Sequence, residues 1–247
     1  MMRTLRKLWV RGFQRDKFQI VKREDGVFLV NYKNYIDRKI MIDGAYERTQ
    51  LARLAEFATK IQAAHFFDIG ANIGVYSVRM ARVPTIRHIH SFEPMPANRN
   101  QLHANVLLNG LNDIVTIHPF ALSNEDGTST FLQNKGNSTG RSRIKATNTS
   151  KIDAEKFIEV EIETRKFDPL FTLTNQRVAM KIDVEEQERK VLEGMPSFLR
   201  NNTCVIQMEA YAGAAGSTDK FLLDQGYSVI ETIHSDRYYS NIPELLV

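Results

Sequence analysis

The sequence of 247 residues is poor in cysteine, in tryptophan and in long apolar runs. A single cysteine, Cys204, excludes an internal disulfide and any cysteine-rich zinc site, and it fits a reducing, cytoplasmic compartment. No run of about 18 apolar residues predicts a membrane span, and no uninterrupted apolar segment near the start predicts a signal peptide. Lysine and arginine (33) barely outnumber aspartate and glutamate (29), so no global basic field predicts binding to nucleic acid.

The basic residues are instead concentrated in residues 1–23, where lysines and arginines alternate with apolar residues and Asp16 is the only acid. This pattern predicts a basic amphipathic helix. Packing of its apolar residues on the domain is the favoured interpretation. Peripheral contact with an anionic membrane surface is the alternative.

The chain is long enough for one large α/β domain with a well-buried core. Residues 18–42 alternate apolar and polar residues around Asp25–Gly26, which predicts two strands joined by a hairpin turn. The apolar run at 39–43 is assigned to the same small β-element. Residues 1–45 are therefore predicted to form an N-terminal extension, and residues 46–247 the main domain.

Helices and strands alternate along the main domain, with helices predicted at 46–61, 95–109 and 186–200. Such alternation predicts a doubly wound α/β fold with a mostly parallel sheet and crossover helices. A long polar segment at 128–170 interrupts the alternation, and we interpret it as an insertion on the substrate side.

The main domain is organised around residues 65–81, HFFDIGANIGVYSVRMA. This stretch predicts an apolar strand running into Asp68, a turn containing Gly70 and Gly74, and then a helix. Glycines let the backbone approach a ligand closely, and the free N–H groups of the first helical turn face it. The stretch therefore predicts a site for a nucleotide-like ligand.

Four acids lie at or near the carboxyl ends of predicted strands, where open α/β sheets bind their ligands: Asp68, Glu93, Asp183 and Glu209. Glu93 follows Gly70 by 23 residues, close to the spacing at which an acid accepts hydrogen bonds from ribose hydroxyls. The turn lacks the middle glycine of a dinucleotide fingerprint, and Asp68 could pair with a ligand amino group while Asn72 hydrogen-bonds a carboxylate. These features favour S-adenosylmethionine over NAD.

Three ordered motifs resemble the FkbM family of S-adenosylmethionine-dependent methyltransferases: DIGANIGVYS at 68–77, FEPMPAN at 92–98, and KIDVE at 181–185. The resemblance runs from about residue 46 to about residue 211. It implies a seven-stranded, Rossmann-like class I methyltransferase fold and O-methylation of a sugar, polyketide or similar small molecule. One position departs from the family pattern, because Glu186 stands where the family usually has glycine.

The resemblance also implies roles for individual residues. By position, the methionine end of the cofactor is held by Asp68, Gly70, Asn72 and Gly74, its ribose by Glu93, and its adenine beside Ala121, Leu122 and Ser123. Asp183 and Glu185 match the family's acidic motif.

Methyl transfer to a hydroxyl requires a group that takes its proton. We expect Asp183 or Glu185 to be this base, with His118 in reserve. Binding of Mg²⁺ by Asp183, Glu185 and Glu209 is an alternative role for these acids. We expect residues 1–45 and 128–170 to form the acceptor pocket. The expected acceptor is a small molecule or a glycan. A nicotinamide-dependent dehydrogenase and a non-catalytic cofactor-binding scaffold are the competing functions.

Overall fold

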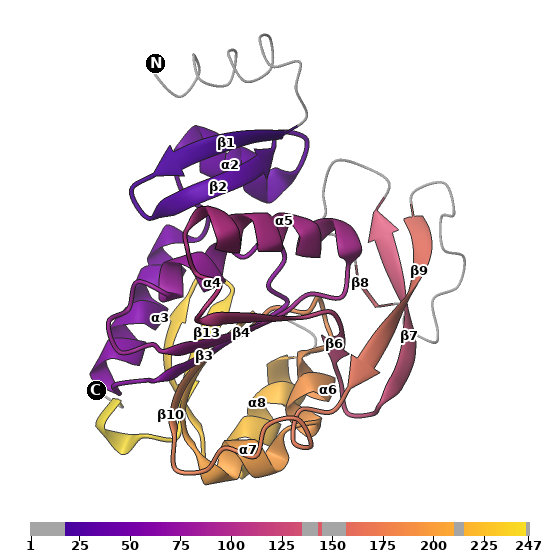
Figure 1. The fold of residues 1–247 in the computed structure, drawn as a ribbon. Coiled ribbons are helices and arrows are strands. Elements are labelled where there is room, and N and C mark those ends of the chain that lie inside the picture. The colour runs from indigo at the N-terminus through magenta and orange to yellow at the C-terminus, as the bar shows by residue number, and fades with distance from the viewer. Residues whose placement is uncertain (1–17, 135–142, 145–156, 210–214, 246–247) are drawn as a thin grey trace.

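The computed structural model describes residues 18–134, 143–144, 157–209 and 215–245. Its centre is a seven-stranded sheet in which β13 runs antiparallel to both of its neighbours and the other paired strands are parallel (Figure 1). This confirms the doubly wound, mostly parallel α/β fold. In spatial order the strands are β12 (Ser228–Ile233), β13 (Asp236–Ser240), β11 (Thr203–Glu209), β10 (Arg177–Ile182), β3 (His65–Ile69), β4 (His88–Phe92) and β5 (Val115–His118).

The sheet separates two apolar cores, because successive side chains of a strand point to opposite faces. On β3, Phe66 belongs to the core under one set of helices and Phe67 to the core under the other. The first set is α3 (Arg48–Lys60), α4 (Val75–Met80) and α5 (Pro96–Leu108). The second is α6 (Glu188–Glu193), α7 (Pro196–Asn201) and α8 (Ala215–Asp224).

The helix predicted at 186–200 is two helices. Gly194 and Met195 separate α6 from α7, and Pro196 is the first residue of α7. Proline has no N–H for a preceding helix and is favoured at a helix start, which explains the break. A Cβ atom on Gly194 would lie 2.1 Å from the Ser123 carbonyl oxygen, so the chain passes closely here.

The N-terminal extension contains the predicted hairpin, with β1 (Phe18–Arg23) paired to β2 (Gly26–Asn31). Residues 18–23 are therefore strand, and the rest of the predicted basic helix, residues 1–17, lies outside the described residues. The strand assignment of 39–43 is wrong, because these residues belong to helix α2 (Tyr35–Asp43). Ile36, Ile40 and Met41 recur at helical spacing and pack against β2.

Helix α5 runs beside β2 (Figure 1). Polar side chains of α5 and of its C-cap residue bond to the free edge of β2, where a third strand would otherwise pair. Asn109 Oδ1 accepts a hydrogen bond from the Val27 amide (2.9 Å), and Asn109 Nδ2 donates to the Val27 carbonyl (2.7 Å). Asn105 Oδ1 accepts from the Leu29 amide (2.6 Å), and Gln101 Nε2 donates to the Leu29 carbonyl (2.8 Å). The hairpin is thereby fixed beside the main sheet.

A second small sheet forms at the predicted insertion, in the spatial order β6 (Ala121–Leu122), β9 (Phe157–Arg165), β7 (Gly127–Asn134) and β8 (Arg143–Ile144). Figure 1 shows β7 and β9 projecting beside the main sheet. Segments 135–142 and 145–156 lie outside the described residues. A short 3₁₀ helix, η2 (Pro243–Leu245), follows β13. No helix among the described residues is both long and apolar enough to cross a membrane.

Candidate functional site

The turn after β3 brings the backbone of two strands together. Gly70, Asn72 and Gly74 have φ angles of 85°, 51° and 82°, in the left-handed region. The amides of Gly70 and Ala71 both donate to the Phe92 carbonyl (3.1 and 2.9 Å) at the end of β4. A Cβ atom on Gly70 would lie only 1.9 Å from the Asp183 carbonyl oxygen, so this position requires glycine. The turn therefore packs closely against the carboxyl ends of both strands that flank β3, which are β4 and β10.

Asp68 anchors the helix that follows the turn. Its Oδ2 atom accepts hydrogen bonds from the Ser77 amide (2.9 Å) and the Ser77 hydroxyl (2.5 Å). Burial raises the pKa of Asp68 to about 6, although the Ser77 contacts and Lys181 oppose that shift. Asp68 also borders a cavity that lies over this turn.

Glu93 is held in place by two backbone amides, with Oε2 accepting from Asn72 (2.9 Å) and Oε1 from Met95 (2.9 Å). The side chain is buried, and burial raises its pKa to about 7 in spite of those hydrogen bonds. The Oδ1 atom of Asn72 is buried and has no hydrogen-bond partner within the described part of the chain. An unsatisfied acceptor beside an oriented carboxyl group is suited to a ligand that brings its own donors.

A cavity of about 640 Å³ lies over this turn. Most of the predicted cofactor-binding residues border it: Asp68, Gly70, Asn72, Glu93, Ala121 and Leu122. Gly74 and Ser123 lie outside its lining. Gly74 is the N-cap of α4, and the Ser123 amide donates to the Arg165 carbonyl (2.9 Å).

The structure places His118 away from the cavity, on the sheet face covered by aromatic side chains. Its ring stacks on Phe92 with centroids 4.5 Å apart, and its Nε2 atom lies 3.2 Å from Nδ1 of His90. Burial lowers the pKa of His118. His118, the base expected in reserve, therefore lies in an aromatic cluster and not at the cavity.

Asp183, Glu185 and Glu209 all border the cavity. Among the described residues, however, no group of three histidine, cysteine, aspartate or glutamate side chains is placed to hold a metal ion. The interpretation of these acids as a Mg²⁺ site is not supported.

The turn after β10 enters the left-handed region without glycine. Glu185 has a φ of 52° and Glu186 a φ of 72°. Non-glycine residues adopt this region at a cost of about 1–2 kcal/mol each. Three non-glycine residues with such φ angles border the cavity: Glu47, Asn72 and Glu185. Strained backbone of this kind is typical of functional sites.

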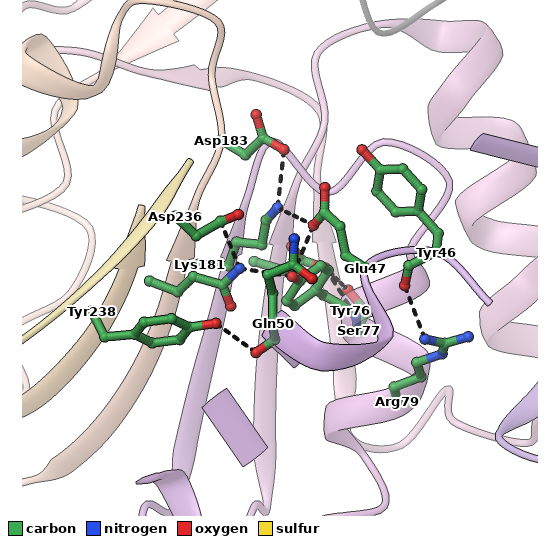
Figure 2. A network of polar contacts seen from close by, with 12 residues as sticks. Tyr46, Glu47, Gln50, Tyr76, Ser77, Arg79, Lys181, Asp183, Asp236 and Tyr238 are labelled. Carbon is green, nitrogen blue, oxygen red and sulfur yellow. Dashed lines mark hydrogen bonds and ion pairs between the residues drawn. The ribbon is translucent and has the colours of Figure 1, made fainter. Parts of the chain in front are cut away.

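A network of charged and polar groups around the buried Lys181 lies in the cavity wall and was missed by sequence reasoning (Figure 2). The Lys181 ammonium donates to Asp183 Oδ2 (3.0 Å) and to Glu47 Oε2 (3.1 Å), and it lies 4.3 Å from the centre of the Tyr76 ring. Tyr76 donates its hydroxyl hydrogen to the same Glu47 oxygen (2.9 Å). Gln207 Nε2 donates to Tyr76 (2.8 Å) and to Asp236 (2.8 Å).

Opposing effects set the charges in this network. Burial disfavours the charge on Lys181, but Asp183, Tyr76 and Glu47 together raise its pKa well above the usual value. Burial likewise disfavours the Glu47 carboxylate, yet Lys181 and hydrogen bonds leave its pKa lowered. Both groups are therefore charged at neutral pH. One signal was present in the sequence: Lys181 is a charged residue directly after the apolar run 178–180 and directly before Ile182.

The extension and the small sheet complete the cavity. Tyr35, Ile36 and Arg38 of α2 border it on one side, and Phe131 of β7 and Ile162 of β9 on another. These residues come from the two segments expected to form the acceptor pocket.

Comparison with known proteins agrees with this geometry. The family model described as "Methyltransferase FkbM domain" matches residues 68–229, more than half of the chain. "Methyltransferase 1" from Beauveria bassiana (strain ARSEF 2860) is 29% identical over 175 residues, covering 65% of this chain and 66% of that relative. The chain thus spans just under two thirds of the relative's length.

The structure of methyltransferase FkbM from Methylobacillus flagellatus KT superposes with a TM-score of 0.50 at 13% identity. The superposition covers 72% of this chain and 44% of that one, and it shows a shared fold.

Proposed function

The chain belongs to the FkbM methyltransferase family, and we propose that it transfers a methyl group from S-adenosylmethionine to a hydroxyl oxygen of a sugar, glycan or other small molecule. The observation that carries the proposal is the position of Glu93. Its carboxyl group is oriented by the Asn72 and Met95 amides beside the glycine turn, at the carboxyl edge of the sheet.

The residues present fit this donor. Glu93 offers carboxylate oxygens to a vicinal diol such as that of ribose, and the unsatisfied Asn72 Oδ1 offers a further acceptor. Ala121 and Leu122 supply an apolar wall for the adenine. The absence of a side chain at Gly70 lets the turn pack closely against the Asp183 carbonyl.

S-adenosylmethionine supplies an activated methyl carbon when bound, so the chain has to orient the acceptor, exclude water and take a proton. Asp183 and Glu185 border the cavity and are our proposed general bases. Asp183 is oriented by its ion pair with Lys181. An acceptor hydroxyl placed against either carboxylate would lose its proton there as the new oxygen–carbon bond forms.

The acceptor is proposed to bind between α2 and the small sheet, against Tyr35, Arg38, Phe131 and Ile162. A cavity of this size, with mixed aromatic and polar walls, suits a small molecule or a sugar unit. We do not expect a nucleic acid to be the acceptor.

Calorimetric titration with S-adenosylhomocysteine, and separately with NAD, tests the cofactor. We expect micromolar binding of S-adenosylhomocysteine alone, and its loss in Glu93→Ala. Glu93→Gln keeps the side-chain shape and should weaken binding less than Glu93→Ala, which separates ligand contact from misfolding. Failure of well-folded wild-type protein to bind S-adenosylhomocysteine would contradict the proposal. Binding of NAD instead would favour a dehydrogenase. If the expected result is obtained, a screen of hydroxylated acceptors follows.

A further inference from the structure

Glu47 borders the cavity and lies outside the three family motifs. It lies just before α3 with φ and ψ of 48° and 41°, a left-handed conformation that a glutamate adopts only at an energetic cost. Its Oε2 atom accepts from both Lys181 and Tyr76, so the carboxylate is fixed in orientation. Figure 2 shows Glu47 and Asp183 on either side of the Lys181 ammonium.

This arrangement leaves one negative charge uncompensated. Two carboxylates, Glu47 and Asp183, share the single ammonium of Lys181. Among the described residues that line the cavity, six carry a carboxyl group and two are basic, although the chain as a whole carries a net charge of +4. The acids are Glu47, Asp68, Glu93, Asp183, Glu185 and Glu209, and the bases are Arg38 and Lys181.

We propose that Glu47 is a donor-specificity residue: with Asp183 and Lys181 it forms an anionic wall that favours cationic S-adenosylmethionine over the neutral product. This inference rests on the proposed function. The sulfonium gives the donor a net charge of +1, whereas S-adenosylhomocysteine is a zwitterion of net charge zero. A fixed negative charge in a partly desolvated cavity therefore discriminates between two ligands of nearly equal shape.

The wall has a consequence for turnover. Transfer of the methyl group removes the charge that the wall attracts, so the product is held less tightly than the donor. Product release is thereby favoured. The discrimination depends on Glu47 being ionised, which its ion pair with Lys181 ensures.

The test compares three ligands by calorimetry: S-adenosylmethionine, S-adenosylhomocysteine, and sinefungin, which carries an amine in place of the sulfonium. In Glu47→Gln we expect binding of the two cationic ligands to weaken about tenfold, equivalent to about 1.4 kcal/mol, and that of S-adenosylhomocysteine less than about twofold. Asp183→Asn removes the same charge and should act in the same direction. Glu56→Gln is the matched control, because Glu56 lies on α3 and is exposed.

Equal weakening of all three ligands in Glu47→Gln would overturn the inference, because it would assign Glu47 to the ammonium group that the ligands share. Unchanged binding of all three would overturn it as well. Absence of S-adenosylhomocysteine binding in the wild type would instead contradict the proposed function itself.

Discussion

Gly70 determines how closely two strands of the main sheet approach at the cavity. Its φ of 85° and the position of the Asp183 carbonyl are two separate reasons for glycine, one conformational and one steric. Gly110, which follows α5, shares only the first, because its φ is 67° but no atom lies within 4 Å of a built Cβ. Comparing Gly70 with Gly110 therefore separates the cost of a left-handed backbone from the cost of a steric clash.

Gly70→Ala is expected to lower the free energy of unfolding by about 3 kcal/mol or more, because the methyl group forces apart β3 and β10. Gly110→Ala is expected to cost about 1 kcal/mol, the penalty of a left-handed alanine alone. Urea denaturation measures both. Equal losses in the two variants would contradict the steric argument.

Local patterns predicted the residues that lie close together in the sequence. Asp68, Gly70, Asn72 and Glu93 follow from a strand, a turn and a spacing of 23 residues. The contact between Glu47 and Lys181 joins residues 134 positions apart and depends on how α3 packs against the sheet, so no local pattern predicts it. The departure at Glu186 was visible in the sequence, but only the structure shows that the turn keeps a positive φ there.

Helix α5 has a structural role beyond covering the sheet. Gln101, Asn105 and Asn109 recur every four residues and therefore lie on one face of the helix. Their amide groups satisfy backbone groups on the outer edge of β2, which would otherwise be an unpaired strand edge. Asn105 also donates to the Ile73 carbonyl (2.7 Å), which connects the hairpin to the ligand turn.

Asn105→Ala is expected to lower the free energy of unfolding by about 2–4 kcal/mol, because the Leu29 amide and the Ile73 carbonyl each lose a partner. Asn100→Ala, on the exposed side of the same helix, should change it by less than about 0.5 kcal/mol. Chemical denaturation gives both values. A loss below about 1 kcal/mol in Asn105→Ala would mean that water replaces the amide.

The errors in element assignment have local physical causes. Residues 39–43 contain a short apolar run that resembles a buried strand, but Ile36, Ile40 and Met41 form the helical stripe that packs on β2. Hydrophobic periodicity in a segment this short does not separate the two structures. The break between α6 and α7 was signalled by Pro196, and apolar residues on both sides of it concealed the signal.

The two cores of the molecule differ in their polar content. The face covered by α6 and α7 contains a histidine cluster in which His90 stacks on Phe67 and approaches His118. Burial, together with His118, His65 and His88, lowers the pKa of His90 to about 4. The carboxyl groups of Asp68 and Glu93 are shifted in the opposite direction, so the pH dependence of the whole molecule is a balance of opposed effects.

A substitution at His90 isolates one side of this balance. Between pH 6.5 and 4 the unfolded chain binds a proton on His90 that the folded protein does not bind, so His90 makes stability fall as the pH is lowered. We expect the wild type to lose on the order of 3 kcal/mol more than His90→Phe over this interval, while phenylalanine preserves the stacking on Phe67.

Urea denaturation at half-unit steps from pH 7.5 to 4 measures this difference, since the buried carboxyl groups contribute equally to both proteins. His103→Phe, at an exposed position of α5, is the control and should follow the wild type. Parallel stability curves for the wild type and His90→Phe would show that His90 takes up its proton in the folded protein, which would require water to reach the core between β4 and Phe171.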